Sequence, residues 1–250
     1  MTDTERRIAY NYEMQMCRTG KINGVNYQDS LFRGIEVDGD SVDSDKIQFE
    51  RALVNSQISN ILKQAGVDTS SITKDCTFTV DPYSYEITVD GVDEETKVLM
   101  QNALNVGNNG KNLYKHIYYC STQDGCESSQ VTEESKMKYE AYHQVYSYTG
   151  YELDKLEEKN GTYYTESGEN ILDLVDSAVE SSGKVPKEFK QQMRNWIHDL
   201  VSTISTRGWN NVPDMTLSIL YGKSGLKDMN QLITYQYEAD STNRQWYSVL

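Results

Sequence analysis

The spacing of apolar residues is the feature that most constrains this chain, because it changes along the sequence from a helical period to a β period. In residues 45–65, apolar positions such as Val54 and Ile58 recur every three or four residues, which is typical of one face of an α-helix. In residues 76–80 and 85–89, apolar and polar side chains alternate on either side of a proline-containing turn. The sequence therefore predicts an α+β fold, mostly helical with a small antiparallel sheet.

The same criteria predict further elements on both sides of these segments. Helices are expected at residues 4–16, 93–105, 111–119, 132–148, 171–179 and 186–206, and short strands at 162–165, 217–221, 232–237 and 245–249. The helix that contains Pro186 in its first turn has the longest apolar stripe. Its buried side is expected to consist of Phe189, Met193, Trp196, Ile197, Leu200, Val201 and Ile204.

A chain of 250 residues can bury roughly 70–75% of the surface that its unfolded form exposes. We find no internal repeat and no proline-rich linker that would divide it. We expect a single globular domain over residues 1–250, with two lobes and a weak boundary near 121–131 as the alternative.

The formal net charge of −14 limits the classes of partner. Nucleic-acid binding is not expected, because it depends on clustered Lys and Arg that neutralise phosphates. Residues 1–7 do not resemble a secretory signal, and no apolar run is long enough to span a membrane. We therefore expect a cytoplasmic protein without membrane insertion, although export by another route stays open.

Cysteine and histidine are the main candidates for chemistry. The cysteines Cys17, Cys76, Cys120 and Cys126 form no C-x-x-C pair, and the histidines His116, His143 and His198 form no local metal motif. Cys120 and Cys126 could close a small disulfide loop in an oxidising compartment, but thiols are the favoured state. For an enzyme, Cys120, His116 and His143 are the first suspects, while Cys126 or His198 could also take part in a nonlocal Cys–His pair.

Two other patterns invite a ligand interpretation without completing a motif. Residues 107–112 and 222–224 contain glycine beside lysine, but neither matches the phosphate-binding sequence G-x-x-x-x-G-K-[ST], and both are interpreted as turns. The acidic residues 38–45 could gather oxygen ligands for Ca²⁺, but Val42 and Phe49 stand at two of the positions where an EF-hand needs ligands. No metal and no cofactor is therefore assigned.

Tyrosine is unusually abundant, with 19 residues in the chain. Five of them fall within residues 139–151. Core packing explains most of these rings, but an exposed subset would form a recognition patch for a protein or a sugar.

A run of motifs resembles a known family over about residues 78–117. It consists of Phe78-Thr-Val-Asp-Pro-Tyr83, Ile87-Thr-Val-Asp-Gly91, Leu104-Asn105, Gly107-Asn-Asn-Gly-Lys-Asn-Leu-Tyr114 and His116-Ile117. This combination is similar to uncharacterised bacterial proteins known only as a domain of unknown function. The resemblance implies a bacterial origin and supplies no catalytic residues.

These observations favour a non-enzymatic module that acts by binding another protein. A hydrolase with a nonlocal Cys/His site, or a module that binds Ca²⁺ or glycans, are the alternatives. Because an active site can be assembled from residues far apart in the sequence, the absence of local motifs does not decide between them.

Overall fold

The computed structural model describes residues 51, 54–121 and 130–229. The chain divides into two compact units. Unit 1 comprises Met1–Val80, Tyr85–Ser128 and Leu217–Leu250, and unit 2 comprises Asp81–Ser84 and Ser129–Thr216. One division of the chain falls between Ser128 and Ser129.

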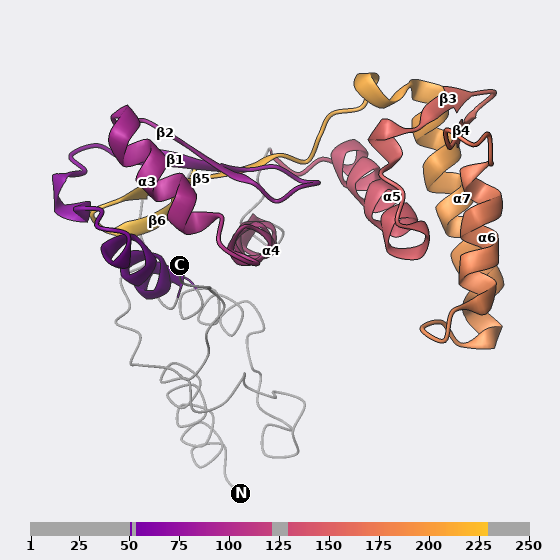
Figure 1. Cartoon of the computed structure of the whole chain (residues 1–250), viewed down its shortest axis with the longest axis horizontal. Coiled ribbons are helices and arrows are strands. Elements are labelled where there is room, and N and C mark those ends of the chain that lie inside the picture. The colour runs from indigo at the N-terminus through magenta and orange to yellow at the C-terminus, as the bar shows by residue number, and fades with distance from the viewer. Residues whose placement is uncertain (1–50, 52–53, 122–129, 230–250) are drawn as a thin grey trace, which may run out of the picture. The chain divides into compact units, whose positions relative to one another are not determined.

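The architecture of the described residues is α+β, as predicted, with helices predominating (Figure 1). Unit 1 contains a four-stranded antiparallel sheet in the order β2-β1-β5-β6. Its strands are β1 (Cys76–Val80), β2 (Ile87–Asp90), β5 (Leu217–Gly222) and β6 (Gly225–Asp228). The β1–β2 hairpin and β5 confirm the predicted alternation, and residues 222–225 form the tight connection between β5 and β6 instead of a phosphate site.

One face of this sheet is apolar because the strands follow the period of two. Phe78 lies opposite Val89 on one neighbouring strand and opposite Ile219 on the other, so the three buried side chains are adjacent on the same face. Helix α3 (Glu94–Leu104) packs against β2, and α4 (Asn109–Ser121) packs against β1 and β5. Residues 54–64 form a further helix with buried apolar positions, preceded by the helical residue Arg51.

The start of α4 departs from the sequence prediction. The segment 107–110 was expected to break the chain before a helix at residue 111, but Asn109 and Gly110 already belong to α4. The glycine has a packing reason, since a Cβ atom at residue 110 would lie 1.9 Å from the carbonyl oxygen of Tyr85. Gly107, with a φ of 60°, makes the turn between α3 and α4.

Unit 2 is built on three helices: α5 (Glu133–Thr149), α6 (Ile171–Ser181) and α7 (Lys190–Arg207). A hairpin of β3 (Glu157–Lys159) and β4 (Thr162–Tyr164) lies between α5 and α6 in the sequence. The short 3-10 turns are η2 (Thr69–Ser71), η3 (Leu153–Lys155), η4 (Lys187–Phe189) and η5 (Trp209–Asn211). All three helices pack against one another around an apolar core.

Helix α7 corrects one detail of the prediction. Ile197, Val201 and Ile204 are buried as expected, but Phe189 and Trp196 are 53% and 37% exposed. The apolar stripe is wider than the contact surface that α5 and α6 provide, so its edge remains in solvent.

Several predicted elements lie outside the described residues. These are the helix at 4–16, the acidic residues 38–45, the first part of the 45–65 helix, the loop 122–129 with Cys126, and the segments 232–237 and 245–249.

Candidate functional site

The most unusual polar feature of unit 1 is a buried arginine. Arg51 Nε donates a hydrogen bond of 2.9 Å to His116 Nε2, and a terminal guanidinium nitrogen lies 2.7 Å from Asp228 Oδ1. Three elements meet here: the helical segment that contains Arg51, α4 and β6. Arg51 is completely buried, so the Asp228 carboxylate and the imidazole provide the polar contacts that a desolvated cation requires.

The contacts of His116 define its protonation. Because Nε2 accepts a hydrogen bond from Arg51, the proton of the neutral ring is assigned to Nδ1. Burial, and then the nearby positive charge of Arg51, hold the pKa of His116 well below its usual value of 6.5. The imidazole is therefore neutral at pH 7.

Cys120 joins this group one helical turn after His116. Its Sγ atom lies 3.8 Å from His116 Nε2, as the i, i+4 spacing on α4 allows. Cys120 is reduced and almost completely buried. We call Arg51, His116, Cys120 and Asp228 the arginine cluster. Only the Cys120–His116 pair was among the suspects; Arg51 and Asp228 were missed, because they lie 65 and 112 positions from His116 in the sequence.

The arginine cluster is a poor general base for hydrolysis. A Cys–His dyad needs a histidine nitrogen that can take the thiol proton, but Nε2 already accepts the Arg51 N–H, and the guanidinium opposes an imidazolium. The third suspect, His143, belongs to unit 2, where its Nε2 lies 2.8 Å from the carbonyl oxygen of Pro82.

Unit 2 contains a second polar group, centred on Lys138 of α5. Its buried ammonium donates to the carbonyl of Val212 at 2.8 Å, lies 2.7 Å from Asp214 Oδ1, and lies 4.4 Å from the centre of the Trp209 ring. The Tyr83 hydroxyl donates to the same Asp214 carboxylate. These contacts attach the turn of residues 81–84 to α5, so the group has an architectural explanation.

The tyrosines of residues 139–151 do not form one exposed patch. Tyr142 is buried against Tyr83 and Trp209, and Tyr139 packs on His143. Tyr146 and Tyr151 are exposed.

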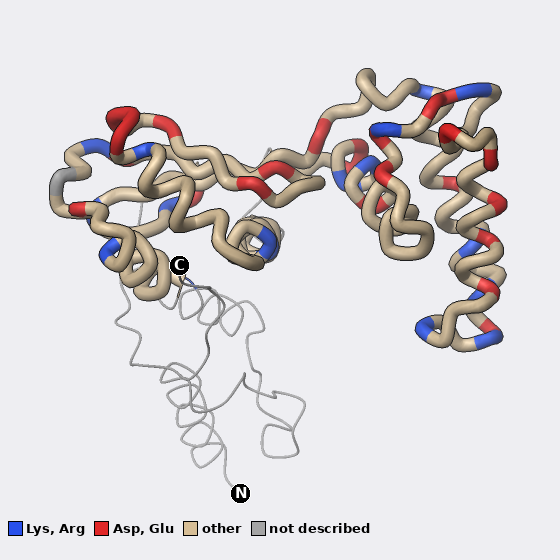
Figure 2. The backbone as a smooth tube through the Cα atoms, in the orientation of Figure 1, with Lys and Arg blue, Asp and Glu red and all other residues tan. Residues whose placement is uncertain are grey.

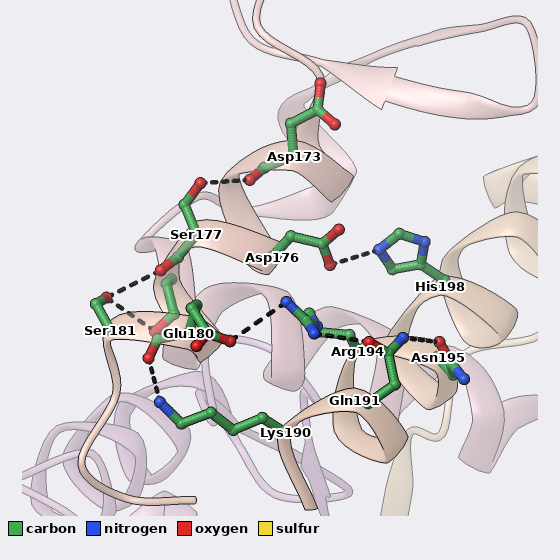
Figure 3. A network of polar contacts seen from close by, with 11 residues as sticks. Asp173, Asp176, Ser177, Glu180, Ser181, Lys190, Gln191, Arg194, Asn195 and His198 are labelled. Carbon is green, nitrogen blue, oxygen red and sulfur yellow. Dashed lines mark hydrogen bonds and ion pairs between the residues drawn. The ribbon is translucent and has the colours of Figure 1, made fainter. Parts of the chain in front are cut away.

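Helices α6 and α7 are joined by a polar network (Figure 3). His198 Nε2 lies 2.8 Å from Asp176 Oδ1, and Arg194 contacts both Glu180 and Gln191. His198, the last of the histidines considered for catalysis, is thus part of an interhelical contact. This network occupies one side of α7.

The opposite side of α7 is apolar and exposed. Phe189, the last residue of η4, is followed at four and three residues by Met193 and Trp196 of α7, and Met193 is half-buried against the core. At 100° per residue, Trp196 is roughly 160° around the helix from His198. We call these three residues the α7 face.

Charge and metal ligands give no further site. Acidic positions are interspersed with basic ones over both units (Figure 2). Within the described residues, no three His, Cys, Asp or Glu side chains are grouped so that they could hold a metal ion. In the same part of the chain, no helix combines the length and the apolar character that a bilayer span requires.

Comparison with known proteins extends the resemblance seen in residues 78–117. A family model described as "Domain of unknown function (DUF4885)" matches residues 1–248. The uncharacterised protein YbdO of Bacillus subtilis (strain 168) is 30% identical over 236 residues, which cover 94% of this chain and 59% of that relative. The chain therefore spans less than two thirds of the length of YbdO. No solved structure matches significantly.

Proposed function

Because the chain belongs to the DUF4885 family, whose description assigns no activity, we propose from its geometry that it is a non-enzymatic interaction module that binds a partner protein through the α7 face. The observation that carries this proposal is the exposure of Phe189 and Trp196 on either side of Met193. Large aromatic side chains dominate binding energy at protein interfaces, and leaving them in water forgoes the free energy of their burial.

The geometry of the α7 face favours a helical partner. Its three side chains lie within eight residues, about 10 Å along the helix axis, and form a ridge that fits between the side chains of an amphipathic helix. The polar network with α6 holds α7 from the other side, so the ridge is fixed before the partner binds.

Charge favours a basic partner over a second copy of this chain. Two molecules that each carry a formal charge of −14 repel one another, whereas a basic segment is attracted. The charges beside the α7 face are mixed, with Glu188 and Asp199 next to Lys187 and Lys190, so the preference for a basic partner rests on the net charge of the whole chain. We therefore propose an amphipathic helix with a basic polar side as the occupant.

We also propose that the protein acts in the cytoplasm of a bacterium. A cytoplasmic bacterial protein is consistent with the relative in Bacillus subtilis and with the composition, and no nucleic acid or cofactor is invoked. A Cys120 hydrolase is less well supported, since His116 is engaged by Arg51. The Ca²⁺ alternative depends on residues 38–45, outside the described structure, and a glycan site would depend on the exposed Tyr146 and Tyr151.

The proposal is tested with two synthetic helical peptides that share a leucine face and differ in carrying lysine or glutamate elsewhere. We expect the full chain to bind the lysine peptide in fluorescence anisotropy, and Trp196→Ala or Phe189→Ala to weaken binding at least about tenfold. Val98→Ala and Leu99→Ala on α3 are matched controls, because these side chains are also exposed and apolar.

Three outcomes would overturn the proposal. The α7 variants could bind like the wild type, the glutamate peptide could bind equally well, or sedimentation could reveal a dimer that Trp196→Ala dissociates. The last result would identify a second copy as the occupant.

A further inference from the structure

The outer strands of the four-stranded sheet carry backbone groups with which a further strand could pair. Within the part of the chain that the structure describes, these strands are β2 and β6. In an antiparallel pair, every second residue of an outer strand directs its N–H and C=O groups away from the neighbouring strand. An outer strand whose outward groups are open is a template on which a strand of another molecule can add.

Helix α3 occupies the outward groups of β2 with side-chain carboxamides. The Ile87 N–H donates to Asn105 Oδ1 at 2.7 Å, and Asn105 Nδ2 donates to the Ile87 carbonyl oxygen at 2.9 Å. One turn earlier, Gln101 Oε1 accepts from the Val89 N–H at 2.9 Å. Asn105 therefore exchanges the same two hydrogen bonds with Ile87 that a residue of a paired strand would exchange. We call the side chains of Gln101 and Asn105 the α3 amides.

The edge at β6 is closed by the same kind of group. The Leu226 N–H donates to Oδ1 of Asn55, which lies on the helix of residues 54–64, at 2.7 Å. Gly225 leaves room for this amide, because a Cβ atom at residue 225 would lie 2.4 Å from the side chain of Asn55. Both outer strands thus meet a carboxamide carried by a helix, so edge closure is a recurring feature of this unit.

We propose that α3 is an autoinhibitory cover of the β2 edge, and that the strand it excludes is β2 of a second copy of this chain. Without the α3 amides, two β2 strands can pair antiparallel about a twofold axis through the outward groups of Ile87 and Val89. Ile87 of one copy then lies opposite Val89 of the other, and Thr88 faces Thr88. Threonine pairs of this kind stabilise antiparallel sheets.

Two acidic side chains oppose the same pairing. Glu86 and Asp90 are exposed and share the solvent face of β2 with Thr88. In the pairing centred on Thr88, Glu86 of each copy would lie opposite Asp90 of the other, and like charges at opposite positions are destabilising. Reversing the charge of Glu86 would turn this repulsion into an attraction in that register, which makes the register testable.

The experiment compares variants of the full chain by sedimentation velocity. Gln101→Ala with Asn105→Ala removes the α3 amides, and Glu86→Lys is added to attract Asp90 of the second copy. We expect this triple variant to associate at least about tenfold more tightly than the same double variant with Glu166→Lys. Glu166 is exposed in unit 2, so its reversal changes the net charge equally but leaves the β2 edge unchanged. Glu86→Lys with the α3 amides intact should sediment like the wild type.

Two results of this comparison would overturn the proposal. A triple variant that is folded by circular dichroism could sediment like the wild type at every concentration, which would show that the α3 amides exclude nothing. Alternatively, the variant with Glu166→Lys could associate as tightly as the one with Glu86→Lys, which would identify nonspecific aggregation.

Hydrogen exchange covers the case in which the multiple variants do not fold. In the wild type, the Ile87 and Val89 amides should exchange at least about a hundredfold more slowly than in an unfolded chain. Gln101→Ala alone should accelerate exchange of the Val89 amide at least about tenfold and leave that of Ile87 unchanged. If both wild-type amides exchange as in an unfolded chain, the edge is open and the cover does not exist.

Discussion

At the scale of single residues, His116 shows how a contact determines a titration. Arg51 and burial keep its imidazole neutral in the folded chain, whereas the unfolded chain presents an ordinary histidine with a pKa of about 6.5. The folded pKa is the lower of the two, so the unfolded state binds more protons as the pH falls through about 6.5. The contribution of neutral His116 to the free energy of unfolding is therefore fully present above about pH 6.5 and is lost progressively as the pH falls below it.

We therefore expect unit 1 to lose up to about 1.4 kcal/mol per pH unit below about pH 6.5 through His116. Urea unfolding at several pH values, for the wild type and for His116→Gln, isolates this contribution from that of the carboxylates. An identical pH dependence in the wild type and His116→Gln would contradict the assignment.

Gly110 provides a steric test at the same scale. Gly110→Ala should destabilise the protein by about 1–3 kcal/mol, because the added methyl group meets the Tyr85 carbonyl oxygen and α4 must shift. Gly183→Ala is the matched control, since a Cβ atom there meets nothing within 4 Å. Thermal unfolding of both variants measures the difference, and equal effects would argue against the close approach.

At the scale of elements, Lys138 makes α5 the support for the turn of residues 81–84. Lys138→Met keeps the apolar stem but removes the donor to Val212 and Asp214, and should cost about 1–3 kcal/mol. Lys136 on the same helix is half-buried. Lys136→Met should change the free energy of unfolding by less than about 0.5 kcal/mol. Chemical denaturation followed by tryptophan fluorescence compares the two. If they are equal, the buried ammonium does not stabilise the turn.

Elements were predictable where local periodicity determines them. The N-cap contact of Asp93 and the left-handed Gly150 mark the start of α3 and the end of α5 as the sequence indicated. Strand β3 was missed because Glu157, Glu158 and Lys159 are all exposed and show no alternation. The apolar stripe of α7 is wide, and the sequence does not show which of its edges the neighbouring helices cover. The burial of Arg51 was not predicted, because its partners His116 and Asp228 are distant in the sequence.

At the scale of the whole molecule, the two units have separate cores. Phe78 lies in the core of unit 1 and Ile197 in that of unit 2, and both are completely buried. Phe78→Ala should lower the free energy of unfolding of unit 1 by about 2–5 kcal/mol, and Ile197→Ala should lower that of unit 2 by a similar amount. Hydrogen exchange of the full chain should show lost protection in β1 for the first and in α7 for the second. Simultaneous loss in both units would show that they unfold together.

The pairing of β1 with β5 joins residues 76–80 to residues 217–222 across the main segment of unit 2. During translation the β1–β2 hairpin emerges long before β5 exists, so the edge of β1 stays unpaired while the inserted helices are being made. Helices α5, α6 and α7 contact one another within a short stretch and can assemble during that interval. A chain truncated after residue 216 should thus contain a formed helical unit and an incomplete sheet that needs shielding from other strands.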